Sequence, residues 1–193
     1  MSSEGNYNIA IFASGAGSNA NQICNYFEHH PSIKVKLIIC NKRDAGVFKV
    51  AEKYNIESLY VPKSDWSEES LLHSQLQSNQ ISHIVLAGFL LLVPDWLVEH
   101  YRGNIINIHP ALLPKYGGKG MYGMHVHEKV KQDGELVSGI TIHSVDEHYD
   151  EGDILFQDII ELTLDDSASD IAAKVLRLEH FHYPRIIEKW ICP

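Results

Sequence analysis

The chain has 193 residues, 45% of them hydrophobic and 21% charged, with a formal net charge of −9. This composition is typical of a globular protein, and the length suits one domain with a sizeable core. The acidic balance and the lack of a lysine or arginine cluster in the sequence argue against a nucleic-acid partner.

Nothing in the sequence points to a membrane or to export. No apolar run reaches the roughly 18–20 residues that a membrane span requires. The first residues, MSSEGNYN, lack the basic and apolar parts of a signal peptide. We therefore expect a cytoplasmic protein with a single domain over residues 1–193, of which 1–6 form a flexible polar tail.

Strand and helix patterns alternate along the first 110 or so residues. Short apolar runs predict buried strands, over Tyr7–Ala13, Ile33–Cys40, Glu57–Val61, Ile81–Ala87 and Gly103–Ile108. Helices are expected to begin near Ser18, Val47, Glu68 and Pro94, the third of them capped by Asp65 or Ser67. This alternation predicts a doubly wound, Rossmann-like α/β fold on a mainly parallel sheet.

The pattern changes after Pro114. The glycine-rich stretch KYGGKGMYGM, residues 115–124, predicts a loop. Further segments predict a helix over His125–Asp133, strands over Val137–Val145 and Asp153–Glu161, and a helix from about Ser167 to Trp190. We expect the two late strands to give the sheet a mixed C-terminal part.

Three candidate sites follow predicted strands, because ligands bind beyond the carboxyl ends of the strands in sheets of this kind. They are Ser14–Asn19, Gly88–Leu92 and Asn107–Pro114. In the first, glycines and a helix N-terminus could cradle a phosphate, with Ser18 and Asn19 as donors. The alternative is a tight turn with Ser18 as the helix cap.

The third segment carries the residues best suited to catalysis. Asn107 and His109 are two apart, so an extended chain projects both to one face. An amide and an imidazole there could polarise a carbonyl and move a proton. If the Asp150 carboxylate reaches His109, we expect it to raise the imidazole pKa and favour the cation. Asp150 could instead be a solvated loop acid.

A metal site is a weaker reading of the histidines. His125 and His127 could project from one side of an extended segment and bind zinc together with His109 or His143. They could equally line the loop or begin the next helix. We expect no metal.

Several segments, in this order along the chain, resemble the folate-dependent formyltransferases. They are SGAGSN at 14–19, LAGFL at 86–90, NIHPALLPKYGG at 107–118, Asp150-Glu151-Gly152, and LEHFHYP at 178–184. The motif NIHP with a downstream Asp-x-Gly is shared across that family, whereas SGAGSN is specific to its glycinamide ribonucleotide branch. The resemblance implies transfer of a formyl group from 10-formyltetrahydrofolate, as co-substrate, to the amine of 5-phosphoribosyl-glycinamide in purine biosynthesis.

The resemblance also implies roles for individual residues. Catalysis falls to Asn107, His109 and Asp150. The ribonucleotide would contact Gly17, Ser18, Asn19, Leu176, Arg177, Leu178 and Glu179. The folate would contact Leu90, Leu91, Leu92, Val93, Asn107, Asp146, Glu147, His148, Tyr149 and Asp150. Thr141 takes the place of a small hydroxyl residue near the catalytic centre.

Two features depart from better-known members of the family. An arginine that meets the folate glutamate tail is replaced by the aliphatic run Leu90–Leu92, and the segment near Glu69, where some members place another arginine, is acidic. The segment KGMYGMHVH is longer than in many relatives, and it is either a lid over the folate or a surface insertion.

Other functions remain open at this point. A formyltransferase could act on another amine, such as a sugar nucleotide or initiator methionyl-tRNA, although the RNA substrate calls for a basic surface. A non-catalytic ligand-binding module with the same fold is the third reading. The expected partners are small molecules, with neither nucleic acid nor membrane, in a monomer or homodimer.

Overall fold

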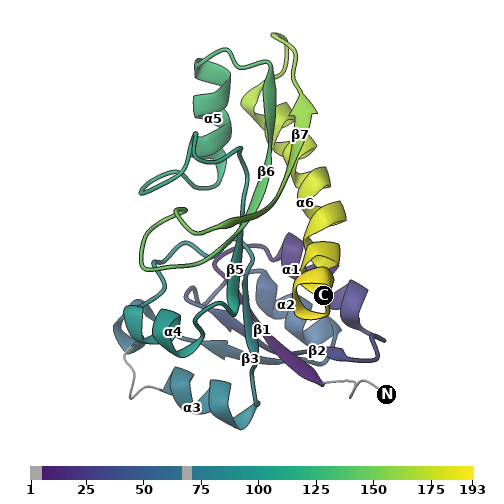
Figure 1. Cartoon of the computed structure of the whole chain (residues 1–193), viewed down its shortest axis with the longest axis vertical. Coiled ribbons are helices and arrows are strands. Elements are labelled where there is room, and N and C mark those ends of the chain that lie inside the picture. The colour runs from purple at the N-terminus through teal and green to yellow at the C-terminus, as the bar shows by residue number, and fades with distance from the viewer. Residues whose placement is uncertain (1–5, 67–70) are drawn as a thin grey trace.

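A seven-stranded sheet runs through the computed structural model, which describes residues 6–66 and 71–193 (Figure 1). The strands are β1 Tyr7–Ala13, β2 Ile33–Cys40, β3 Glu57–Tyr60, β4 His83–Leu86, β5 Ile105–His109, β6 Val137–Ser144 and β7 Ile154–Glu161. Their order is β3-β2-β1-β4-β5-β6-β7. The neighbours from β3 to β5 pair in parallel, whereas β6 pairs antiparallel with both β5 and β7. The predicted fold, with its mixed C-terminal part, is confirmed.

Helices cover both faces of the sheet (Figure 1). They are α1 Ser18–Phe27, α2 Val47–Lys53, α3 Leu71–Ser78, α4 Asp95–His100, α5 Met124–Gln132 and α6 Ala168–Ile191, with a short 3-10 helix η1 at Lys63–Asp65. Side chains alternate along β1, so Ile9 and Ile11 join a core with α1, α2 and α6. Ala10 and Phe12 join a second core with α3 and α4.

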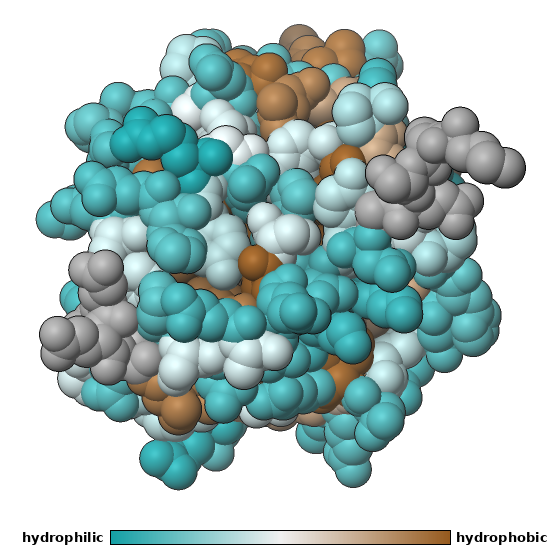
Figure 2. All heavy atoms as spheres, turned by 60° about the horizontal axis from the view of Figure 1, so that its bottom comes forward, coloured by the Kyte–Doolittle hydropathy of each residue, from teal (hydrophilic) through white to brown (hydrophobic). Residues whose placement is uncertain are grey.

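The expected bounds agree with the observed ones to within a few residues, apart from two regions. The expected start of the third helix near Glu68, its alternative cap Ser67 and most of the polar tail lie outside the described residues. Asp65 belongs to η1. None of the described helices is long and apolar enough to cross a membrane, and the face in Figure 2 is mostly hydrophilic, with apolar residues in small patches.

Helix α6 is fixed at its start and near its end. A capping box begins it, in which the side chains and backbone amides of Ser167 and Asp170 bond reciprocally. Further along, the fully buried Tyr183 donates its hydroxyl to the backbone oxygens of Leu86, at 2.8 Å, and Ile106, at 3.3 Å. This holds α6 across β4 and β5, near the sheet edge that carries the three candidate sites.

Candidate active site

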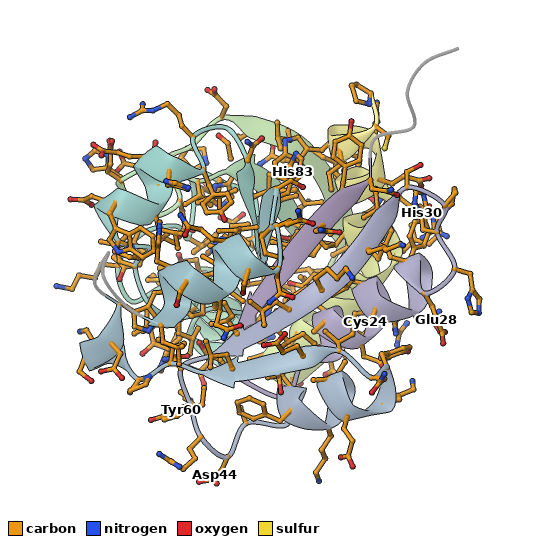
Figure 3. All side chains as sticks on the ribbon, turned by 90° about the horizontal axis from the view of Figure 1, so that it is seen from below. Cys24, Glu28, His30, Asp44, Tyr60 and His83 are labelled. Atoms are coloured by element: carbon orange, nitrogen blue, oxygen red, sulfur yellow. The ribbon has the colours of Figure 1, made fainter. Side chains whose placement is uncertain are left out.

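A cavity of about 390 Å³ opens at the carboxyl ends of β4 and β5, where this type of sheet binds ligands. Its lining includes the catalytic candidates Asn107, His109 and Asp150. Another cavity, of about 430 Å³, lies at the amino ends of β2 and β3, where Cys24, Glu28 and His30 line it (Figure 3). The first cavity is therefore the candidate active site.

The two polar side chains of β5 point into this cavity, as their spacing predicts. His109 is buried, and its Nε2–H donates to the backbone oxygen of Tyr116 at 2.8 Å. A carbonyl oxygen can only accept a hydrogen bond, so Nε2 must carry a proton. The other nitrogen, Nδ1, faces Asp150 Oδ2 at 3.6 Å.

Asp150 is held at the site by its backbone and by a loop amide. The residue adopts a left-handed conformation, with φ of 59°, which turns its carboxylate inward so that the side chain is only 12% exposed. The backbone N–H of Gly118 donates to Oδ2 at 2.9 Å. The alternative of a solvated loop acid is therefore wrong.

The expected effect of Asp150 on His109 is present, but the expected cation is not favoured. Burial lowers the pKa of His109, and although the nearby Asp150 carboxylate raises it, the net direction is downward. Burial alone would raise the pKa of Asp150, but His143, His109 and the Gly118 amide together hold it below its usual value. The site therefore rests as a neutral imidazole beside an ionised carboxylate.

His143 joins the site as a residue that the sequence interpretation considered only as a zinc ligand. Its Nδ1–H donates to the backbone oxygen of Ser144 at 2.7 Å. On its other side, Nε2 lies 3.2 Å from Asn107 Nδ2. The same Nε2 lies 3.6 Å from Asp150 Oδ1. His143 thereby orients the Asn107 amide and lies against the carboxylate.

A signal for His143 is present in the sequence. Thr141 and His143 are polar residues two apart in an apolar strand, so they share a face, and antiparallel pairing sets them opposite His109 and Asn107. Thr141 is fully buried and does not line the cavity. Its hydroxyl donates to Ala111 O at 2.7 Å and anchors the chain that follows β5.

The phosphate candidate lies at the end of β1 and the start of α1. Gly17 has φ of 80°, and a Cβ there would lie 2.8 Å from Val47 Cγ2, so a glycine is required. Gly17 itself is the residue that precedes the helix, and no side chain caps it. The alternative of Ser18 as the cap is therefore wrong, and the first backbone amides of α1 have no capping side chain to accept from them.

Helix α6 reaches the same place. Asn19 Nδ2 donates to Glu179 Oε2 at 2.7 Å, and both side chains are buried. Burial raises the pKa of Glu179 to about 7, against the opposing effect of that hydrogen bond. Asn19 Oδ1 is buried with no partner among the described residues. The other predicted ribonucleotide contacts on α6 are less buried than Glu179: Leu176 and Arg177 are exposed, and Leu178 is half-buried.

The phosphate and folate candidates meet at Ser14. Its buried hydroxyl donates to Asn41 Oδ1 at 2.6 Å and accepts from the N–H of Leu90 at 2.9 Å. Six folate candidates besides Asn107 and Asp150 line the cavity, namely Leu90, Leu91, Leu92, Val93, His148 and Tyr149. Asp146 and Glu147 are not part of the lining, and Glu147 lies 4.0 Å from Arg102.

The loop after β5 forms one wall of the cavity. Residues 118–122 are part of the lining. His125 and His127 lie in the first turn of α5, where His125 is exposed and His127 is buried. They therefore do not project from one side of an extended segment, as a shared zinc site would require. Burial lowers the pKa of His127 to about 4. Within residues 6–66 and 71–193, no three histidine, cysteine or acidic side chains group to hold a metal.

The chain is similar in sequence and in structure to known formyltransferases. The sequence model of the formyl transferase family matches residues 7–187. Phosphoribosylglycinamide formyltransferase of Bacillus subtilis is 37% identical over 186 residues, covering 94% of this chain and 93% of that protein. The crystal structure of the same enzyme from Bacillus halodurans superposes with a TM-score of 0.85 at 34% identity, covering 96% of this chain and 95% of that one.

Plant relatives are longer. The chloroplastic phosphoribosylglycinamide formyltransferase of Vigna unguiculata is 38% identical over 190 residues, which are 93% of this chain. The chain spans 59% of that relative's length and 63% of the Arabidopsis thaliana protein's.

Proposed function

The chain belongs to the formyl transferase family, and we propose that it transfers a formyl group from 10-formyltetrahydrofolate to the amine of 5-phosphoribosyl-glycinamide. The products are the N-formyl ribonucleotide and tetrahydrofolate, and the reaction belongs to purine biosynthesis. One observation carries the proposal. An amide, an imidazole and a carboxylate converge in one cavity beside a glycine-rich helix start. The named relatives give no support to a sugar nucleotide as acceptor.

In this proposal the transfer is direct. The amine nitrogen attacks the formyl carbon, and the carbonyl oxygen becomes an oxyanion. The Asn107 Nδ2–H donor stabilises it, with about 3–4 kcal/mol for a donor of this kind, and the charge of protonated His109 adds to that. The bond from carbon to folate N10 then breaks, and a proton moves from the amine nitrogen to N10. Asp150, beside the cavity, is placed to assist that movement, directly or through water.

The neutral resting state of His109 suits the first step. A primary amine arrives largely as its ammonium form and must lose a proton before it can attack. A neutral imidazole can take that proton, and the resulting cation gains the Asp150 carboxylate 3.6 Å away. The charge needed by the oxyanion is then created when the substrate is in place.

The ribonucleotide would bind across α1 and α6. Its phosphate would meet the amides and side chains of Gly17, Ser18 and Asn19, and its ribose would meet Glu179, which Asn19 already contacts. The pterin would lie against the Leu90–Val93 wall. We also propose that residues 1–193 form one catalytic domain, acting in the cytoplasm on small molecules as a monomer or homodimer.

The test is an assay of the purified protein with both substrates, following release of tetrahydrofolate. Wild type should turn over, whereas His109→Ala and Asp150→Asn should lose turnover by orders of magnitude with ribonucleotide affinity nearly unchanged. No release of tetrahydrofolate, with both substrates shown to bind, would overturn the proposal.

A further inference from the structure

We propose that Lys119 binds the carboxylates of the glutamate tail of the folate co-substrate. This inference rests on the proposed function, and it names the residue that selects for that part of the ligand. The tail is anionic and extends from the apolar ring end of the molecule. Its binding site should therefore combine an apolar wall with a cation near the mouth of the cavity.

Lys119 is the one lysine or arginine among the described residues that line the cavity. Residues 1–5 and 67–70, outside the described ranges, include no lysine or arginine in the sequence. The wall at Leu90–Leu92 is aliphatic, and the ionised group inside is the Asp150 carboxylate. Without Lys119, an anionic tail would meet a cavity whose fixed charge is negative.

Other cations near this region are engaged elsewhere. Lys115, in the same loop, lies 2.9 Å from Glu135 Oε1, and Arg102 lies 4.0 Å from Glu147 Oε1. Neither of these two residues lines the cavity. Lys119 is exposed and makes no ion pair with a carboxylate in the described part of the chain, so its ammonium is available to a ligand.

The position of Lys119 in the chain links tail binding to the catalytic carboxylate. The N–H of the preceding residue, Gly118, donates to Asp150 Oδ2. Gly118 and Gly120 have φ of 90° and 92°, and glycines in this left-handed region let the backbone on either side of Lys119 adjust at low cost. A glutamate tail bound to Lys119 would draw this loop toward Asp150 and the cavity that the loop lines.

The expected contribution is modest, because an exposed ammonium is solvated and screened by salt. Calorimetry should compare two stable 10-formyl folate analogues, one with a single glutamate and one ending at the benzoate. For Lys119→Ala, we expect the Kd of the glutamate form to rise about fivefold, in a salt-dependent way. The Kd of the form without glutamate should stay within about twofold.

Lys115→Ala is the matched control, since it removes a lysine of the same loop that points to Glu135. It should leave both Kd values nearly unchanged, and Lys119→Arg should restore tail binding. The inference is overturned if Lys119→Ala weakens both analogues equally, weakens neither, or if wild type binds them with equal affinity. The readout is binding, so it is separate from the turnover assay that tests the proposed function.

Discussion

The backbone N–H of Leu90 is bonded to the hydroxyl of Ser14, at 2.9 Å, across the ends of β4 and β1. That N–H is therefore not free to bind the pterin. It serves to fix the Leu90–Val93 wall to the loop proposed to hold the phosphate, with Asn41 accepting from the same hydroxyl. One buried hydroxyl thus links the two proposed substrate sites.

Replacing Ser14 by alanine should disturb the folate site from outside it. The half-buried Leu90 N–H would lose its partner, and a lost hydrogen bond of this kind costs about 0.5–1.5 kcal/mol of stability. We expect the Kd for a folate analogue to rise about tenfold, as measured by calorimetry. Ser82→Ala is the control, because it removes a hydroxyl bond to Asn8 O at the other end of β4. It should affect stability alone, and equal folate affinity in both variants would contradict the role of Ser14.

Asp150→Asn should change the titration of His109. The carboxylate raises the pKa of His109 against the larger effect of burial, so its removal should lower that pKa further. Carbon-bound imidazole protons followed by NMR against pH measure this directly. Asp158→Asn, which changes a carboxylate 2.7 Å from His182 Nε2, should leave the His109 curve unmoved. A rise of the His109 pKa in Asp150→Asn would refute the assigned charge coupling.

Glu179 should make the protein less stable as pH rises from about 4.5 to about 7. Burial raises its pKa to about 7 in the folded chain, from an ordinary value of 4.5. Between these values the unfolded chain ionises and the folded one does not, so unfolding is favoured progressively, and the loss is constant above pH 7. Glu179→Gln should remove that loss, which is on the order of 3 kcal/mol at pH 8.

Urea unfolding at several pH values measures the Glu179 effect. Glu188→Gln provides a control of opposite sign, because hydrogen bonds from Tyr26 and His30 hold the pKa of Glu188 below its usual value. That variant should be less stable than wild type near neutral pH. An unchanged pH dependence in Glu179→Gln would show that the Glu179 carboxyl ionises freely in the folded protein.

Folate binding should protect the loop that lines the cavity. Trypsin can cut after Lys115 and Lys119, and residues 118–122 form part of the cavity wall. If bound ligand holds the loop against the site, cleavage there should slow about tenfold at a ligand concentration ten times Kd. Cleavage after Arg43, in the exposed turn after β2, gives an internal control. Equal protection at both places, or at neither, would make the segment a surface insertion.

Apolar patterning is sufficient to predict the fold, because strands buried on both faces, such as Tyr7–Ala13, are nearly continuous apolar runs. The same-face placement of Asn107 and His109 followed from strand geometry alone. The charge of His109 did not follow, since it depends on burial, which a sequence pattern does not quantify. His143 was underestimated because its importance comes from pairing with β5, a contact between strands distant in the sequence.

The hydrogen bond from Asn19 to Glu179 joins residues 160 positions apart. During synthesis on the ribosome, the carboxyl group that completes the glycine-rich loop is added 160 residues after Asn19. A partly made chain therefore cannot hold the ribonucleotide in the proposed way. Substrate binding becomes a property of the finished fold, and either substrate will stabilise the native chain against unfolding in proportion to its concentration over Kd.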